Sequence, residues 1–101
     1  MPRKAVGLHE DALSEAQAAY DWYAAQDPAA AEAFIGELDH AIKQIETFPS
    51  LGGAYHSGTR RFVLKRFPFA VIYRERHRIT EIIAVAHARR KPGYWKRRIA
   101  N

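Results

Sequence analysis

The side chains most able to do chemistry stand directly after a hydrophobic run near the C-terminus. Residues 82–86 are all apolar, and functional side chains follow them in close succession: His87, Arg89, Arg90, Lys91, Tyr94 and Trp95. Histidine changes its protonation state near neutral pH, while arginine and lysine bind phosphate and carboxylate groups. This order of residues indicates a site for an anionic ligand or target at the end of a buried strand.

Metal-free cleavage of RNA is one reaction within reach of these side chains. It needs a base for the 2′-hydroxyl proton, cations that hold the phosphate, and an acid for the leaving oxygen. His87 is the best candidate for the acid or base. Arg61 and Arg66 could hold the phosphate, and Tyr94 could donate a proton or stack on a base. A histidine at a strand end is at least as often a structural residue that anchors the turn, so both interpretations stay open.

Binding to an anionic target without any reaction is the other use of these residues. Residues 60–101 hold 13 of the 16 Lys and Arg and 2 of the 11 Asp and Glu, a formal charge of +11, whereas residues 1–59 carry −6. Such a gradient favours a polyanionic partner or an acidic protein surface. The candidate contact residues are the cations and aromatics of this half: Arg61, Lys65, Arg66, Arg89, Arg90, Lys91, Tyr94, Trp95, Lys96, Arg97 and Arg98.

Composition excludes several other classes of site. The chain has no cysteine, which rules out disulfides and thiolate chemistry. Its remaining histidines are scattered without paired metal-ligand spacing, and Gly52-Gly53 is not followed by the Lys-Ser/Thr step of a phosphate loop. We therefore expect no metal and no cofactor. With 101 residues and no long apolar segment, the chain is expected to form one domain over residues 1–101, outside membranes, in the cytoplasm.

The first half of the sequence predicts a strand and two helices. Residues 3–9 alternate weakly as a short strand, and a helix is expected from Glu10 to about Gln26. The spacing of its larger apolar residues predicts a buried face: Leu13, Ala16, Tyr20 and Tyr23. Asp27-Pro28 is typical of a helix start, and the apolar spacing from Ala31 to Phe48 continues until Pro49. Two helices joined this tightly form an antiparallel hairpin.

The second half predicts a sheet. Residues 50–58 contain three of the six glycines and are expected to be an irregular connection. Strands are then expected over 59–67, 69–73 and 79–87, with a break at Pro68 and a turn over 74–78. The last strand is apolar on both faces and should be central. The predicted fold is α+β: an N-terminal strand, an antiparallel helical hairpin and a three-stranded antiparallel meander, with the helices on one face.

In this arrangement the chain resembles the RelE/ParE superfamily of bacterial type II toxins, in particular its ParE-like plasmid-stabilisation branch. The resemblance covers nearly the whole chain, and it is carried by short segments in a fixed order: Trp22-Tyr23, Phe48-Pro49, residues 60–64, Phe67-Pro68-Phe69, Ile72-Tyr73 and residues 85–95. It implies a growth-inhibiting toxin that is silenced by a cognate antitoxin. The antitoxin would form a hetero-oligomer with the toxin and cover the basic face with an acidic, partly disordered segment.

The resemblance leaves the target of the toxin open. ParE-like members poison DNA gyrase without an obvious hydrolytic site, and this is the leading interpretation. RelE-like members are endoribonucleases that cut messenger RNA on the ribosome, which would make His87, Arg61, Arg66 and Tyr94 catalytic. The third alternative is a non-toxic nucleic-acid-binding protein or an inactive relative whose only partner is the antitoxin.

Overall fold

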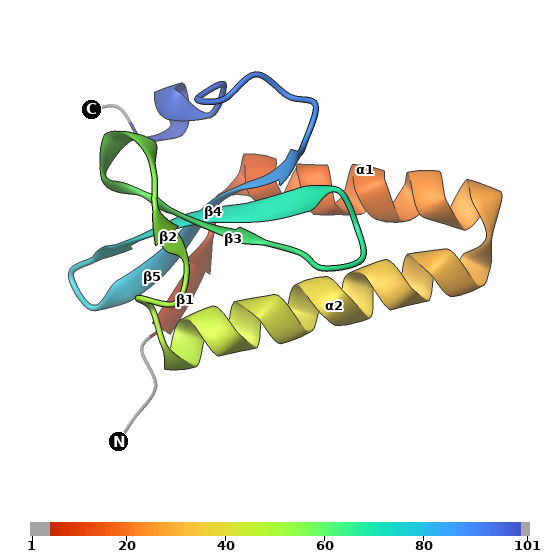
Figure 1. The fold of residues 1–101 in the computed structure, drawn as a ribbon, viewed down its shortest axis with the longest axis horizontal. Helices are drawn as coiled ribbons and strands as arrows, with labels where there is room; N and C mark the ends of the chain where they lie inside the picture. The colour runs from red at the N-terminus through yellow and green to blue at the C-terminus, as the bar shows by residue number, and fades with distance from the viewer. Residues whose placement is uncertain (1–4, 100–101) are drawn as a thin grey trace.

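The computed structural model describes residues 5–99, in which two helices lie against one face of a five-stranded sheet (Figure 1). The elements follow one another as β1 (Ala5–Leu8), α1 (Glu10–Gln26), α2 (Pro28–Thr47), β2 (Gly53–Ala54), a short 3₁₀ turn (His56–Gly58), β3 (Arg60–Val63), β4 (Phe69–Arg76), β5 (Ile79–His87) and a second 3₁₀ turn (Lys96–Arg98). The strand order is β1-β5-β4-β3-β2, and all neighbours are antiparallel except β1 and β5, which are parallel. The predicted α+β fold is confirmed, with β2 as an additional edge strand.

The two helices form the predicted antiparallel hairpin, and one residue serves both of them. Asp27 ends α1, where its N–H donates to the Tyr23 carbonyl at 2.8 Å. Its side chain also caps α2, because Oδ1 accepts from the Ala29 N–H at 3.0 Å. Pro28 then occupies the first helical position, where no intrahelical N–H bond is lost. The capping predicted from Asp27-Pro28 is therefore observed.

The buried face of α1 agrees with the prediction in part. Ala16 is buried as predicted, with Ala12 and Ala19 beside it, and Tyr23 packs against the core. Leu13, by contrast, is 57% exposed. Tyr20 is only partly buried, and its hydroxyl donates to Glu32 of α2 at 2.8 Å. The physical reason is close packing: alanines bring the helix backbone near the sheet, so Leu13 and Tyr20 are turned to the rim. In α2, the predicted apolar face holds up to Ile45, but Phe48 follows the helix and is 64% exposed.

β5 is an interior strand, as predicted, and both of its faces are covered. Ile82 and Val85 pack under the helices with Phe34 and Leu38. The opposite face is covered by the C-terminal segment, which folds back over the sheet toward the start of α1 (Figure 1). There the buried residues form a second cluster: Ile72, Ile83, Ala84 and Trp95. Ile83 and Ala84 share this face because Ile83 bulges out of the β4–β5 register, in which Ile72 pairs with Ala84 and Tyr73 pairs with Ile82.

Two strand boundaries also differ from expectation. β3 ends at Val63 rather than running to residue 67, and β4 continues to Arg76, so that the turn to β5 is only His77-Arg78. Both turn residues have positive φ angles, 51° and 66°, as expected for a tight hairpin turn whose twist matches the strands. Residues 3–4 of the predicted first strand lie outside the described range, as do residues 100–101 at the end of the chain. None of the helices in the described range has the length and apolar character to cross a lipid bilayer.

Candidate functional site

The predicted site residues are divided between the two faces of the sheet. Side chains of β5 alternate in direction, and Val85 packs toward the helices while Ala86 packs toward the C-terminal segment. His87 follows Val85 to the helix face, where its ring meets Phe69 edge-on at 5.0 Å. Arg61 lies on the other face, since its strand neighbour Phe62 packs into the helix-side core. The His87 ring and the Arg61 guanidinium therefore point to opposite faces, although His87 also borders the hollow that Arg61 lines.

A basic hollow lies on the face away from the helices. It encloses about 100 Å³ between the sheet and the C-terminal segment, over a floor formed by Ala70, Ile72 and Ala86. Its polar and aromatic walls come from β3 and its flank, from the end of β5 and from the segment that follows: Tyr55, Arg61, His87, Arg90, Lys91, Tyr94 and Trp95. We call this space the basic hollow below. No acidic side chain is among the described residues that line it.

Two stacked pairs hold the arginines of the basic hollow. The Arg61 guanidinium lies over the Tyr55 ring, 4.7 Å from its centroid. The Arg90 guanidinium lies over the Tyr94 ring at 3.7 Å. Such cation–π contacts contribute about 0.5–1 kcal/mol at exposed sites. Each guanidinium is therefore positioned before any ligand arrives.

His87 is hydrogen-bonded within its own turn. Its Nδ1 accepts from the Arg89 backbone N–H at 3.0 Å. In the neutral ring, an accepting Nδ1 places the proton on Nε2, so that Nε2 is a donor and not a base. The bond anchors the exit of β5, which is the structural role that sequence reasoning had kept open beside the catalytic one.

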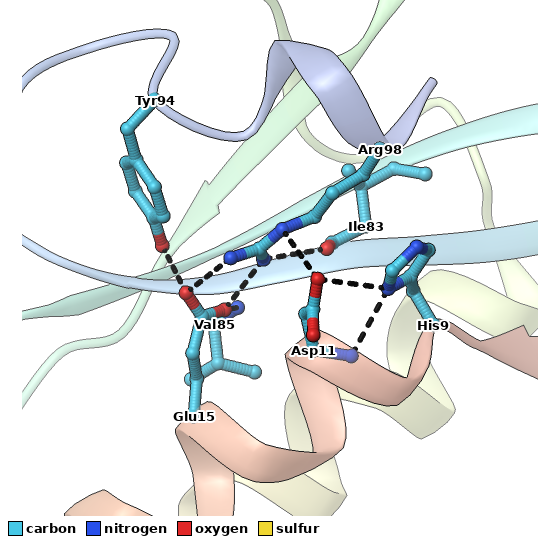
Figure 2. A network of polar contacts seen from close by, with 7 residues as sticks. All are labelled: His9, Asp11, Glu15, Ile83, Val85, Tyr94 and Arg98. Atoms are coloured by element: carbon cyan, nitrogen blue, oxygen red, sulfur yellow. Dashed lines mark hydrogen bonds and ion pairs between the residues drawn. The ribbon is translucent and has the colours of Figure 1, made fainter. Parts of the chain in front are cut away.

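Tyr94 is bound to a carboxylate. Its hydroxyl donates to Glu15 Oε2 at 2.6 Å (Figure 2). Burial and the neighbouring Glu15 raise the pKa of Tyr94 well above its ordinary value of 10.0. A phenol that holds its proton this firmly is a poor general acid near neutral pH.

Glu15 is the centre of a polar clasp between α1, β5 and the C-terminal segment (Figure 2). It accepts from Tyr94, from Arg98 Nη1 and Nη2 at 2.9 Å each, and from the Val85 backbone N–H at 3.0 Å. Burial acts to raise the pKa of Glu15, but the bonds from Arg98, Tyr94 and Val85 outweigh it and hold that pKa below its ordinary value. The carboxylate is therefore charged in the folded protein at neutral pH.

The clasp also completes an unpaired strand edge. β1 pairs with β5 only as far as Ile82. One residue further on, the Ile83 carbonyl accepts from Arg98 Nη1 at 3.0 Å, and the Val85 N–H donates to Glu15. Arg98 and Glu15 thus supply the hydrogen bonds that these two backbone groups would make with a longer β1.

Two of the predicted contact residues are internal. Trp95 is only 1% exposed and packs in the second core cluster, so its assignment to the contact surface is corrected. Arg98 is held by Glu15 and lies 3.6 Å from Asp11, with little of its side chain exposed. It is therefore a structural partner and not a free cation. The exposed cations of this segment are Arg89, Arg90, Lys91, Lys96 and Arg97.

Lys65 and Arg66 lie apart from the basic hollow, in the loop between β3 and β4. Glu37 of α2 accepts from the Lys65 backbone N–H and, at 3.2 Å, from Arg66 Nε. Burial acts to raise the pKa of Glu37, and these bonds to Lys65 and Arg66 lower it more strongly, so that it stays below its ordinary value. This loop borders another hollow of about 360 Å³ along α2, lined in part by His40 and Phe62. The structure therefore does not bring Arg66 together with His87, Arg61 or Tyr94.

An apolar groove runs along the other helix, on the helix face of the sheet. It encloses about 380 Å³ and is lined by residues of α1 and of the β4 and β5 ends: Ala19, Trp22, Tyr23, Pro68, Phe69 and His87. Trp22 is 61% exposed at its rim. A further hollow of about 230 Å³ shares Ala19, Phe69 and His87 and leads to Arg90. The apolar groove beside Trp22 thus adjoins a hollow that Arg90 borders.

Sequence reasoning missed Glu15, Glu37 and Tyr55. A signal existed for Glu15: it stands three residues after Ala12 and four before Ala19, on the buried face of α1. A carboxylate at such a position needs a partner. No local pattern pointed to Glu37 or Tyr55, whose partners come from other elements. Within residues 5–99, no group of three or more histidine, aspartate or glutamate side chains is placed to hold a metal ion.

Comparison with known proteins gives two findings. A family model described as "ParE toxin of type II toxin-antitoxin system, parDE" matches residues 6–92. Among solved structures, one from the chromosomal ParDE TA system from P. aeruginosa superposes with a TM-score of 0.73 at 20% identity, over 82% of this chain and 94% of the other. At that identity the likeness shows the fold. No curated protein sequence matched the chain.

Proposed function

The chain belongs to the ParE toxin family of type II toxin–antitoxin systems, and from this premise we propose that it inhibits growth by acting on DNA gyrase and is neutralised by a cognate antitoxin. The observation that carries the proposal is the gathering of exposed cations after β5. Arg89, Arg90, Lys91, Lys96 and Arg97 all lie on the surface, on a segment that the Glu15 clasp fixes in place.

The charge gradient supports neutralisation by an acidic partner. A formal charge of +11 over residues 60–101 would steer a negatively charged segment to this half of the protein. The groove beside Trp22 offers apolar surface next to Arg90, which suits an amphipathic segment carrying an acidic residue. An antitoxin segment that folds on binding could cover both surfaces at once.

The arrangement of the site weighs against the endoribonuclease alternative. The His87 ring points to the face opposite the Arg61 guanidinium, although His87 borders the hollow that Arg61 lines. Arg66 is bound to Glu37, and Tyr94 is bound to Glu15. A metal-free nuclease needs its base, acid and phosphate-holding cations around one scissile bond. Action by binding does not have this requirement.

The test is induced expression of the chain alone in a bacterial host, followed by growth, plasmid supercoiling and messenger RNA integrity. We expect arrest with relaxed or broken plasmid and intact RNA. The triple variant R89Q/K96Q/R97Q should restore growth by at least tenfold in colony counts, because it removes three exposed cations without touching the clasp. R76Q is the control for loss of one exposed charge elsewhere: Arg76 lies at one end of β4, and Phe69, which pairs with His87, lies at the other.

Other outcomes would decide against the proposal in distinct ways. Arrest with cleaved transcripts and normal supercoiling would establish the endoribonuclease alternative. Growth without arrest, with the protein present and folded, would leave a non-toxic nucleic-acid-binding or antitoxin-binding protein. If the triple variant and R76Q have equal effects on growth, the cations after β5 do not contribute to growth inhibition.

A further inference from the structure

We propose that the basic hollow binds a single phosphodiester group of a nucleic-acid backbone, so that the toxin contacts nucleic acid directly and without reading its sequence. The inference rests on the proposed function, because the nucleic acid that the toxin contacts is the one held by its target enzyme. Its physical basis is the charge, the size and the covered aromatic walls of the hollow.

Charge selects the ligand class. Arg61, Arg90 and Lys91 bring three positive charges to one small space, and no acidic side chain of the described residues lines it. The negative groups nearby are already committed, since Glu15 is bound to Arg98 and Tyr94. A nucleic-acid backbone carries one negative charge at every successive phosphate. With one phosphate in the hollow, Arg89, Lys96 and Arg97 lie outside it, where they can meet the neighbouring phosphates.

The volume of the hollow is sufficient for a phosphate group. It encloses about 100 Å³, whereas one water needs about 10–15 Å³ on this measure. One tetrahedral anion therefore fits between the sheet and the C-terminal segment.

The aromatic walls are not available for stacking. In proteins that bind single-stranded nucleic acid, bases stack on exposed aromatic rings. Here the guanidinium of Arg61 covers Tyr55, and that of Arg90 covers Tyr94. Recognition therefore falls to the guanidinium N–H groups, which suit phosphate oxygens and carry no base information.

The hollow is also built in advance. The Tyr94 hydroxyl is fixed by Glu15, and its ring in turn supports Arg90. On the other wall, the Tyr55 N–H donates to the Thr59 carbonyl at 2.9 Å, and the Tyr55 ring supports Arg61. Cations that are ordered before binding lose less conformational entropy when the ligand arrives.

The experiment measures binding of the full chain, made by cell-free synthesis, to fluorescently labelled duplex DNA, single-stranded DNA and RNA of mixed sequence, over a range of salt concentrations. We expect binding that weakens steeply with salt and does not change with sequence. In R61Q/R90Q the affinity for duplex DNA should fall at least tenfold, and the slope of log affinity against log salt should decrease by about one to two. R76Q should stay within twofold of the unchanged protein. Far-ultraviolet circular dichroism and thermal unfolding confirm that each variant is folded.

The arms of the experiment separate the sources of the ligand. Tighter binding to duplex DNA than to RNA identifies DNA as the source of the phosphate, and the reverse identifies RNA. The inference is overturned if no nucleic acid binds at low salt, if R61Q/R90Q keeps the original slope, or if polyglutamate competes as well as DNA does. Its failure is distinct from that of the proposed function, because growth arrest and loss of supercoiling are measured separately in the host.

Discussion

Glu15 and Arg98 stand 83 positions apart in the chain and form a two-pronged ion pair, in which Nη1 donates to Oε1 and Nη2 to Oε2, each at 2.9 Å. The pair joins the first helix to the last described turn. It therefore fixes the segment that carries the exposed cations to the helix and the sheet. Parallel bonds of this kind are among the stronger polar contacts in proteins.

Replacing Glu15 by glutamine should destabilise the fold. E15Q keeps the size of the side chain but leaves the half-buried Arg98 without its countercharge. We expect the free energy of unfolding in urea to fall by about 2–3 kcal/mol. E10Q, at an exposed position in the first turn of the same helix, should cost under about 1 kcal/mol. Equal losses in the two variants would show that the clasp contributes nothing specific.

Stability should also depend on pH through Glu15. Its pKa is lower in the folded protein than the ordinary value of 4.5. A carboxylate whose pKa is lowered by folding stabilises the fold fully above its unfolded-state pKa. That stabilisation is lost as the pH falls through the folded-state pKa. The melting temperature should therefore drop below about pH 4.5, partly through Glu37, whose pKa is lowered in the same direction. E15Q should show a shallower drop than the unchanged protein, and identical slopes would contradict the assignment.

The two tryptophans provide a matched pair. Trp95 is 1% exposed and Trp22 is 61% exposed. W95A should cost about 3–5 kcal/mol of stability by opening a cavity in the second core cluster, whereas W22A should cost less than about 1 kcal/mol. Acrylamide should quench the fluorescence of Trp22 much more than that of Trp95, measured in the two tryptophan-to-phenylalanine variants. Under the proposed function, W22A should also weaken antitoxin binding.

Replacement by alanine should affect stability differently at the neighbouring positions Gly52 and Gly53. A Cβ at Gly52 would lie 2.8 Å from the Tyr73 hydroxyl and 2.9 Å from the Arg61 carbonyl, and the Gly52 N–H itself donates to that hydroxyl. G52A should therefore cost about 1–3 kcal/mol. A Cβ at Gly53 meets no described atom within 4 Å, so G53A should change the unfolding free energy by less than about 0.5 kcal/mol. Urea unfolding of both variants makes the comparison.

The features that sequence predicted correctly are those set by local chemistry. Asp27 and Pro28 define a helix boundary by their own hydrogen bonding and ring geometry, and the apolar run from Ile82 to Val85 requires cover on both faces. Tertiary contacts decided the rest. Leu13 is exposed because small alanines occupy the buried face of α1, and Trp95 is buried because the C-terminal segment folds over the sheet. The tie between Glu15 and Arg98 joins distant residues, and no local pattern could specify it.

The bulge at Ile83 acts as a shift of phase in the last strand. Residues 82–86 are apolar throughout, so the polarity of the sequence does not reveal which of them point toward the helices. In a straight β5, alternation from Ile82 would turn His87 to the face that carries Arg61. One bulged residue therefore decides to which face the His87 ring points, and here it turns the ring away from the Arg61 guanidinium while His87 still borders the hollow that Arg61 lines.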